Sequence, residues 1–455
     1  MSEQKTAQKY TAKQYAKFII PSIIGVVLML LPIPYNGNWT LMYGVICGKA
    51  DGIVAPIIDW VILAIFAIAV ILSVVAKLAK PKWITENRTL NNIFNISPVY
   101  LVIRIVALVF VACVQFGIGP EAIASGLTGG TAYGLIKTIV VWMFLGSFFI
   151  IFLMDFGIMD LVGTLITRIM RPLFTLPGRS TLDCLASWLG SGTTGVLVTT
   201  IQYNEGYYTT REACIVATCF STVSLSFTLV MSQVVGLEHL FLPVFLTVTA
   251  IVFLCAVVLP RIYPLRKKPD EYYAPVGKKI AEDVPQNVTR FQWGLRNAIA
   301  KSDDMKSVGQ FFGKGLNTAA NVWFDLCPMV MVIATAGLIV AEFTPVFHWI
   351  SAPLVPLLNL LGIPEAAAAA PAMLVGFADQ FIPIAMGANI ASEFTRFFIL
   401  CVAISQLIYM SEIGAILLRS NIKISLWNLF VVFIERTIIA IPVAILVGRF
   451  VLGLS

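Results

Sequence analysis

The chain has 455 residues, of which 58% are hydrophobic and only 12% charged, against about 25% charged residues in an ordinary soluble domain. The mean hydropathy of +0.89 and the repeated apolar runs of about 20 residues indicate a polytopic membrane protein, because a helix of that length crosses the hydrocarbon core. This composition excludes a secreted disulfide scaffold, a soluble enzyme and a nucleic-acid-binding module. The eight cysteines are scattered through apolar segments without a Cys-x-x-Cys pair, so we expect no metal site.

Nine apolar segments are predicted to cross the membrane as helices. The first follows lysines spaced by four residues and is not followed by a small-x-small cleavage site, so we expect a retained span rather than a signal peptide. The nine segments are 18–31, 53–79, 98–116, 135–154, 213–235, 241–260, 321–341, 397–418 and 426–448.

Two further apolar segments, 177–203 and 363–390, are interrupted near the middle by Gly and polar residues. Such interruptions are tolerated at membrane depth only where the backbone faces protein or a water-filled cavity. We therefore predict two re-entrant helical hairpins, the first on the inner side and the second on the outer side.

The distribution of positive charge predicts the orientation. With the N-terminus in the cytoplasm, 25 of the 31 lysines and arginines lie on the inner side, and residues 342–394 contain none. This pattern predicts a multi-pass protein of the cytoplasmic membrane with an external C-terminus. The net charge of +7 then mainly reflects the orientation of the chain in the membrane. We expect the protein to contact the lipid bilayer and not nucleic acid.

An internal duplication accompanies the hairpins. The segment 172–178 (PLFTLPG) resembles 356–362 (PLLNLLG), and the dipeptide Thr-Arg opens the span after each hairpin at 210 and 395. Each copy has three crossings, and because this number is odd, the second copy has the opposite orientation in the membrane. Inverted repeats with broken helices are typical of secondary transporters. The predicted organisation is three N-terminal spans in 1–133, a first repeat in 134–260, a cytoplasmic linker in 261–320 and an inverted repeat in 321–455.

The hairpin tips carry the first group of candidate binding residues. The first tip (SWLGSGTTG, 187–195) combines glycines and hydroxyls, including Ser191, Thr193 and Thr194, and half-helix ends of this kind hold polar or anionic solutes. The second tip contains Asp379 and Gln380, and an intramembrane carboxylate is a functional candidate. The structural alternatives are close Gly/Ser packing at the first tip and a helix cap at Asp379.

The spans after the hairpins are interrupted by polar residues as well. In the first copy we expect Ser221, Thr222 and Ser224 to serve ion coupling, because hydroxyl oxygens and unwound backbone suit sodium. In the second copy we expect Tyr409, Ser411 and Glu412 to bind the solute together with the residues at the tips. A proton carried by Asp379 or by Glu412 is the alternative to sodium.

Other charged residues are assigned structural roles. Arg104, Glu435 and Arg436 lie within predicted spans, and we expect them to compensate one another as an ion pair. No Walker loop, His-Glu-x-x-His or Gly-x-Ser-x-Gly motif is present in the sequence. We therefore predict that the chain is not an enzyme and that it uses no cofactor beyond a coupling ion, Na⁺ or H⁺.

The stretches 171–180 (RPLFTLPGRS), 187–191 (SWLGS) and 210–213 (TREA) resemble the YjiH-type membrane proteins with a nucleoside-recognition, or Gate, domain. That superfamily is similar in design to the concentrative nucleoside transporters. The resemblance implies a trimeric homo-oligomer, ion-coupled uptake and elevator-like movement of the hairpins.

Two functions from different classes follow. The leading prediction is a secondary active transporter of a small polar solute, such as a nucleoside-like metabolite, coupled to sodium or protons. The alternative is a gate or scaffold subunit that acts with a partner membrane protein and transports nothing by itself.

Overall fold

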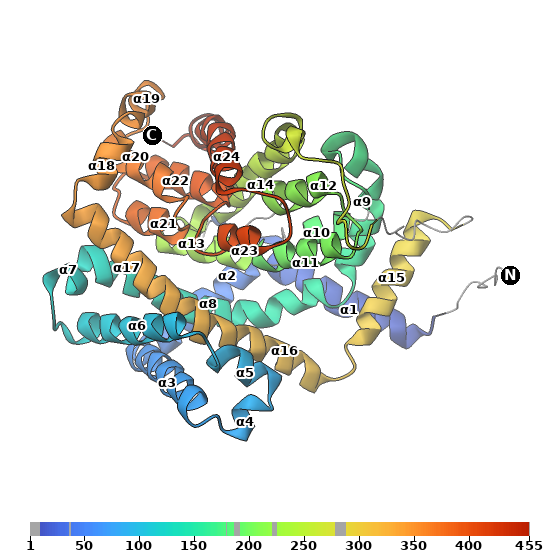
Figure 1. The fold of residues 1–455 in the computed structure, drawn as a ribbon, viewed down its shortest axis with the longest axis horizontal. Coiled ribbons are helices and arrows are strands. Elements are labelled where there is room, and N and C mark those ends of the chain that lie inside the picture. The colour runs from blue at the N-terminus through green and yellow to red at the C-terminus, as the bar shows by residue number, and fades with distance from the viewer. Residues whose placement is uncertain are drawn as a thin grey trace.

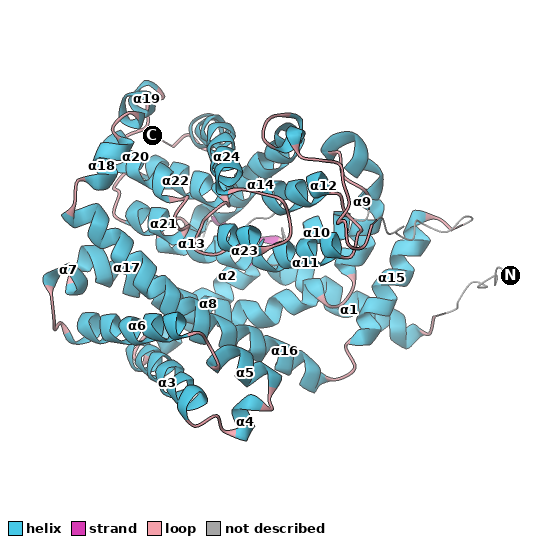
Figure 2. Cartoon of the chain, in the orientation of Figure 1, coloured by secondary structure: helices cyan, strands magenta, loops and turns pink. Residues whose placement is uncertain are grey.

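The fold was examined in a computed structural model that describes residues 10–35, 38–178, 180–185, 192–220, 225–277 and 288–454. These residues are almost entirely helical (Figure 2), which confirms the predicted class of an all-α polytopic membrane protein. One short antiparallel hairpin, formed by β1 (Pro32–Tyr35) and β2 (Asn38–Leu41), is the only sheet among them.

The N-terminal part contributes long helices joined by short connecting ones. Its sharpest boundaries belong to α6, which begins where Ser97 accepts a hydrogen bond from the Tyr100 amide and ends at Gly117, whose φ of 63° closes the last turn. The elements are α1 (Ala12–Met29), α2 (Met42–Val54), α3 (Ile58–Leu78), α4 (Lys82–Thr85), α5 (Arg88–Phe94), α6 (Pro98–Phe116), α7 (Glu121–Ala124) and η1 (Gly126–Gly130).

A long helix, an amphipathic helix, the two short helices α10 and α11, the helical segments α12, η3 and α13, and a second long helix then follow in that order. The segment α12 starts at the capping box of Thr209 and Glu212. The elements are α8 (Thr131–Met154), α9 (Ile158–Phe174), α10 (Ser180–Leu185), α11 (Gly192–Asn204), α12 (Thr210–Ile215), η3 (Val216–Phe220), α13 (Leu225–Val234), η4 (Glu238–Leu240), α14 (Phe241–Val258), η5 (Leu259–Arg261) and η6 (Leu265–Lys267).

The same order of elements occurs a second time after the linker. The long helix now contains a wide π turn, η7, and the amphipathic part consists of two short helices. The elements are α16 (Val308–Asn321), η7 (Val322–Leu326), α17 (Cys327–Phe343), α18 (Val346–Ser351), α19 (Leu354–Leu360), α20 (Ala366–Val375), α21 (Phe381–Ala388), α22 (Glu393–Gln406), α23 (Ile413–Arg419), α24 (Leu426–Leu446) and η8 (Val447–Val451).

Within the described ranges, eight helices are long and apolar enough to cross a membrane. Each of them overlaps one of the nine predicted spans. The remaining predicted span, 397–418, is not one helix, because α22 ends at Gln406 and α23 begins only at Ile413. The half-helices α10, α11, α20 and α21 have 6 to 13 residues, fewer than the roughly 20 needed to cross, and their re-entry into the membrane remains a prediction.

The two copies exchange packing partners at the centre of the molecule. The second half of the first helix–turn–helix, α11, packs against α23 of the second copy, and α21 packs against α13 of the first. Figure 1 shows these short helices gathered together with α14, α22 and α24, while α3, α6, α8, α16 and α17 form a separate group on the other side. The interrupted helices therefore lie between the hairpins rather than at the edge.

The predicted cytoplasmic linker contains an ordered element. Residues 290–304 form the amphipathic helix α15 (Arg290–Asp304), which buries Gly294, Ala298 and Ile299 and packs on α9 and α1. This segment was predicted only as a cytoplasmic linker, and neither the helix nor its apolar face was predicted. Residues 308–320 of the predicted linker instead belong to α16, the beginning of the long helix that runs into α17.

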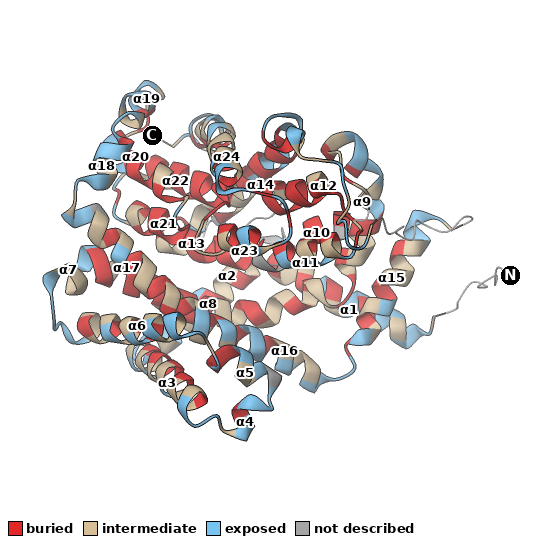
Figure 3. Ribbon diagram, viewed as in Figure 1, coloured by how far each residue is buried: buried red, intermediate tan, exposed pale blue. Residues whose placement is uncertain are grey.

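The two groups of helices in Figure 1 also differ in how far their residues are buried. Figure 3 shows that α12, α13, α21 and α22 are largely buried, whereas α3, α6 and the outer face of α24 expose much of their surface. The exposed side chains on those outer faces include Ile71, Val102 and Ile438. A large apolar exterior of this kind is expected where the solvent is the hydrocarbon of a bilayer.

Candidate solute-binding cavity

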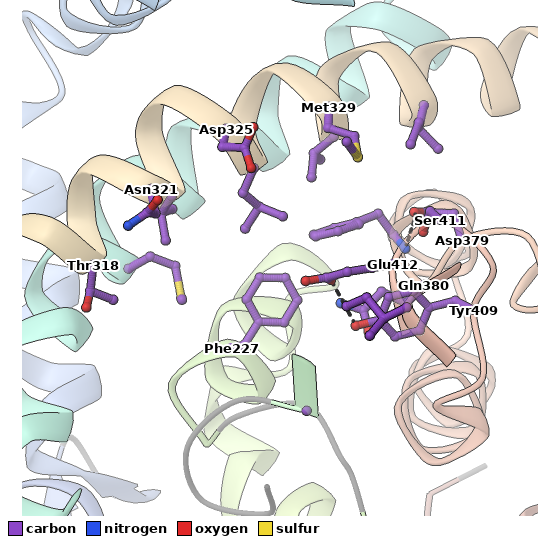
Figure 4. Close-up of a pocket in the computed structure, with 18 of the residues that line it drawn as sticks. Phe227, Thr318, Asn321, Asp325, Met329, Asp379, Gln380, Tyr409, Ser411 and Glu412 are labelled. Atoms are coloured by element: carbon purple, nitrogen blue, oxygen red, sulfur yellow. Dashed lines mark hydrogen bonds between the residues drawn. The ribbon is translucent and has the colours of Figure 1, made fainter. Parts of the chain in front are cut away.

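A cavity of about 850 Å³ lies between the two groups of helices. One wall consists of α8 and the helix that runs through α16, η7 and α17. The other consists of α13, the second helix–turn–helix and the interruption between α22 and α23 (Figure 4). The polar residues that line it are Ser147, Ser226, Thr318, Asn321, Asp325, Asp379, Gln380, Tyr409, Ser411, Glu412 and Arg419.

Asp379 stands at the turn between α20 and α21. Its side chain is 3% exposed, and its two oxygens have different partners: Oδ1 accepts the Phe381 amide at 2.7 Å, and Oδ2 accepts the Ser411 hydroxyl at 2.6 Å. The first bond satisfies an amide in the first turn of α21 and so acts as a cap, although Asp379 precedes the N-cap residue, Gln380. The second bond joins the turn to the interrupted helix. Burial of a carboxylate requires such partners, because an unpaired buried charge is expensive.

The interruption of the second copy begins with Leu407, whose φ of 57° is incompatible with a continuing helix. The chain beyond it pairs with the turn: the Met410 amide donates to the Phe377 carbonyl at 2.8 Å, and the Ser411 amide donates to the Ala378 carbonyl at 3.1 Å. Helical hydrogen bonds lost at the interruption are thus replaced by bonds to the hairpin turn.

Three further predicted residues, Gln380, Tyr409 and Glu412, line the cavity beside this pairing. The Tyr409 hydroxyl donates to Glu412 Oε2 at 3.2 Å, which orients the carboxylate. Gln380 is only 6% exposed, and its Oε1 is a buried acceptor without a hydrogen-bond partner among the described residues. A buried acceptor that lines a cavity is available to a ligand that donates a hydrogen bond.

Five of the predicted site residues are therefore brought together, namely Asp379, Gln380, Tyr409, Ser411 and Glu412 (Figure 4). Ser191, Ser221, Thr222 and Ser224 lie outside the described residues, and so do the side chains of Thr193 and Thr194. The backbone of residues 193 and 194 belongs to α11, whose first residue, Gly192, lines the cavity. The second hairpin and its interrupted helix thus supply the described part of the predicted site.

The facing wall was not predicted. Thr318, Asn321 and Asp325 belong to α16 and η7 and line the cavity on the side opposite the second hairpin (Figure 4). Asp325 stands in a π turn, a departure from the α-helix that often marks functional sites. The signal was present in the sequence, because Asp325 is a carboxylate inside the predicted span 321–341.

The pairing of the charged residues within the spans was predicted wrongly. Arg104 pairs with Asp325, at 3.3 Å from Nη2 to Oδ1, and donates in addition to the Ser73 hydroxyl and the Ile93 carbonyl. Arg436 instead donates to backbone carbonyls. The prediction failed because α6 packs against α17, which a sequence pattern alone does not reveal.

The first helix–turn–helix contains a carboxylate that sequence reasoning also missed. Asp183 of α10 is 5% exposed and accepts from Gln202 Nε2 of α11 at 2.6 and 2.7 Å and from the Tyr208 hydroxyl at 2.5 Å. These bonds join α10 to α11 and to Tyr208 in the segment that follows α11. Asp183 does not line the cavity, so its contacts account for it as a structural residue.

Comparison with known proteins gives three findings. Residues 136–238 match the family model Gate, described as nucleoside recognition, a region that runs from α8 through the interrupted helix to η4. The chain is 46% identical over 450 residues to the uncharacterized protein BpOF4_10220 of Alkalihalophilus pseudofirmus strain OF4, an alignment that covers 99% of this chain and 97% of that protein.

The third finding concerns solved structures. CNTnw in an inward-facing substrate-bound state is similar with a TM-score of 0.38 and 14% identity, over 96% of this chain and 91% of that one. A CNTnw variant in the intermediate 3 state is similar with a TM-score of 0.38 and 14% identity, over 97% and 95% of the two chains.

Proposed function

We propose that this chain, which belongs to the same family as the uncharacterized protein BpOF4_10220, is a secondary active transporter of a small polar solute. The eight apolar helices and the Gate region support a multi-pass membrane protein of the transporter type rather than an enzyme. The description of the Gate region supports a nucleoside-like solute in particular. We place the chain in the cytoplasmic membrane with its N-terminus inside, as a homotrimer in keeping with the resemblance.

The observation that carries the proposal is the meeting of the hairpin turn and the interrupted helix in one cavity. Asp379, Gln380 and Glu412 offer acceptors from one wall, and Asn321 and Asp325 offer polar groups from the other. A site between two structural copies, built from helix ends and unwound backbone, is the arrangement that secondary transporters use for alternating access. In the proposal, Ser191, Thr193 and Thr194 complete the solute site from the first hairpin.

The test uses the purified full chain in proteoliposomes, with labelled uridine and adenosine as probes and imposed sodium or proton gradients. We expect gradient-dependent uptake by the wild type and at least a tenfold loss in Asp379→Asn and in Glu412→Gln, because a tenfold change corresponds to the loss of roughly one hydrogen bond, about 1.4 kcal/mol.

Glu342→Gln is the matched control, because Glu342 is an exposed carboxylate of α17 that does not line the cavity. Wild-type uptake in both site variants would refute the site. Absence of uptake by the wild type, together with a copurifying membrane partner, would favour the gate or scaffold subunit instead.

A further inference from the structure

The walls of the cavity carry more negative than positive charge. Among the described residues that line it, Asp325, Asp379 and Glu412 are acidic, and Arg419 alone is basic. Asp325 is paired with Arg104, which does not itself line the cavity, whereas Arg419 is exposed and is the last residue of α23. The described lining is therefore acidic, with its remaining negative charge at the second hairpin and its interrupted helix.

Asp379 has only neutral partners in this arrangement. The hydrogen bonds that its oxygens accept come from the Phe381 amide and the Ser411 hydroxyl. No ion pair of the described residues includes Asp379. The stretches 186–191 and 221–224, outside the described residues, contain no charged residue in the sequence and so add no cation. A buried carboxylate of this kind is stabilised by a cation that comes from elsewhere.

The next residue adds an acceptor that has no donor. Gln380 is 6% exposed and lines the cavity, and its Oε1 has no hydrogen-bond partner among the described residues. The carboxylate of Asp379 offers about four acceptor positions, more than its described donors fill. This end of the cavity therefore favours a ligand that is rich in hydrogen-bond donors and positively charged.

The same cavity suits an organic cation better than a bare metal ion. Its volume of about 850 Å³ is in the range of sites for small organic molecules. Phe227 and Phe381 line it, with their rings packed edge to face at 5.2 Å between centroids. Aromatic surface next to a few polar groups holds the apolar body of an organic ligand, whereas hard metal ions are bound by shells of oxygen atoms.

We propose that the preferred solute carries a positively charged nitrogen, an ammonium or amidinium group, which Asp379 and Gln380 hold at the second hairpin turn. This inference rests on the proposed transport function and names the class of its solute. An ammonium group has three N–H donors and no acceptor, so it satisfies both side chains and neutralises the buried carboxylate. A solute with an anionic group is repelled by the acidic lining.

The first experiment compares three compounds that differ at one position of the same molecule. They are 5′-amino-5′-deoxyadenosine, which is cationic at neutral pH, adenosine, which is neutral, and adenosine 5′-carboxylic acid, which is anionic. Titration calorimetry and thermal shift measure their binding to the purified full chain. We expect the amine to bind about tenfold or more tightly than adenosine, and the acid to bind most weakly. Adenosine binding as tightly as the amine would overturn the inference.

A second series covers solutes that are not nucleosides. It consists of 1,4-diaminobutane, 1,4-butanediol and succinate, which are cationic, neutral and anionic compounds of four carbons. We expect the amine to raise the Tm most if the chain binds this series. Absence of binding by the cationic compounds of both series would also overturn the inference.

Asp379→Asn tests the residue assignment, because asparagine keeps the shape and the capping oxygen and removes the charge. We expect the preference for the amine over adenosine to fall below about threefold in this variant. Glu342→Gln, which removes an exposed carboxylate outside the cavity, is the matched control and is expected to keep the preference of the wild type. An unchanged preference in Asp379→Asn would contradict the role of Asp379. If that variant does not fold, the two series on the wild type still decide.

Sodium is the competing occupant of the same carboxylate. The Tm of the chain without solute is measured in sodium chloride and in choline chloride at equal ionic strength, and we expect the two values to agree within about 1 °C. A rise specific to sodium that disappears in Asp379→Asn would assign the carboxylate to a metal ion and overturn the inference.

Uptake of the same compounds into proteoliposomes separates this inference from the proposed function. Binding selective for the amine, without uptake of any compound, would refute transport and leave the charge preference intact. Uptake of adenosine at the same rate as the amine, with equal binding of the two, would refute the charge preference and leave transport intact.

Discussion

Asp379 combines a structural and a proposed functional role in one carboxylate. Its Oδ1 caps α21 through the Phe381 amide, and its Oδ2 holds Ser411 of the interrupted helix. A carboxylate oxygen can accept more than one hydrogen bond, so Asp379 can keep both of these bonds and also bind a solute. The cap and the negative charge can be separated experimentally, because asparagine caps helices as well as aspartate does and alanine does not.

The prediction at this position compares two variants. Asp379→Asn is expected to retain the stability of the wild type, whereas Asp379→Ala is expected to lose about 1 kcal/mol through loss of the cap. Thermal unfolding of the purified proteins measures the difference. Equal stability of the two variants would show that the bond to Phe381 does not act as a cap.

The two members of the pair Arg104–Asp325 are expected to respond differently to substitution, because only the arginine is buried. The Arg104 side chain is 2% exposed and has three partners, whereas the Asp325 side chain is 52% exposed and faces the cavity. Arg104→Ala should cost about 3 kcal/mol, because it leaves buried partners unsatisfied, and Asp325→Asn should cost less than about 1 kcal/mol. Urea or thermal unfolding measures both; an equal cost would indicate that Asp325, rather than Ser73 and Ile93, holds the arginine.

At the level of elements, the functional features are interruptions of helices. The polar stretch 405–414 predicted a break in the eighth span, 397–418, and the structure has that break between Gln406 and Ile413. In the linker the structure has a helix where none was predicted. Residues 290–304 form the amphipathic helix α15. The packing of α15 on α9 depends on Gly157, whose φ is 93° and whose missing side chain leaves room for the Ala298 carbonyl.

Gly157→Ala tests this contact. The positive φ alone costs a non-glycine residue about 1–2 kcal/mol, and the added methyl group collides with the backbone of α15. We expect a lower Tm and faster tryptic cleavage within α15. Gly313→Ala is the control, because a methyl group at that position of α16 meets no atom within 4 Å and alanine favours the helix. Unchanged proteolysis in the Gly157 variant would contradict the docking of α15.

At the level of the whole molecule, the ion pairs agree with the predicted orientation. Lys314–Asp155, Lys423–Glu271 and Arg211–Asp270 join residues that the charge pattern assigns to the inner side. His239–Glu393 joins two residues assigned to the outer side. Residues on opposite sides of a bilayer cannot form such pairs, so these pairs agree with the predicted grouping of the loops into two sides.

Cysteine labelling tests the orientation directly, because all eight native cysteines are buried and free. Ala352→Cys and Lys306→Cys place an exposed thiol on the predicted outer and inner sides. In intact cells a membrane-impermeant maleimide should label position 352 and not position 306, and permeabilisation should expose both. The reverse pattern would invert the proposed topology.

By itself the sequence determined the class of the protein, most of its spans and two candidate segments for the site. Hydropathy and loop charge are properties of each segment by itself. They can therefore be evaluated without knowing which other segments it contacts in the folded chain. Asp379, Ser411 and Glu412 were found in this way, because a polar residue at membrane depth is conspicuous in any fold.

Only the tertiary structure decided which of these polar residues meet. It joined Asp379 to Ser411, paired Arg104 with Asp325 instead of Glu435, and brought Arg436 to carbonyls 31 and more than 200 positions away. Contacts of this kind depend on how the two copies pack against each other, with α11 on α23 and α21 on α13. Residue spacing along a single helix contains no information about that packing, which is the physical reason that the cavity and its second wall emerged only from the fold.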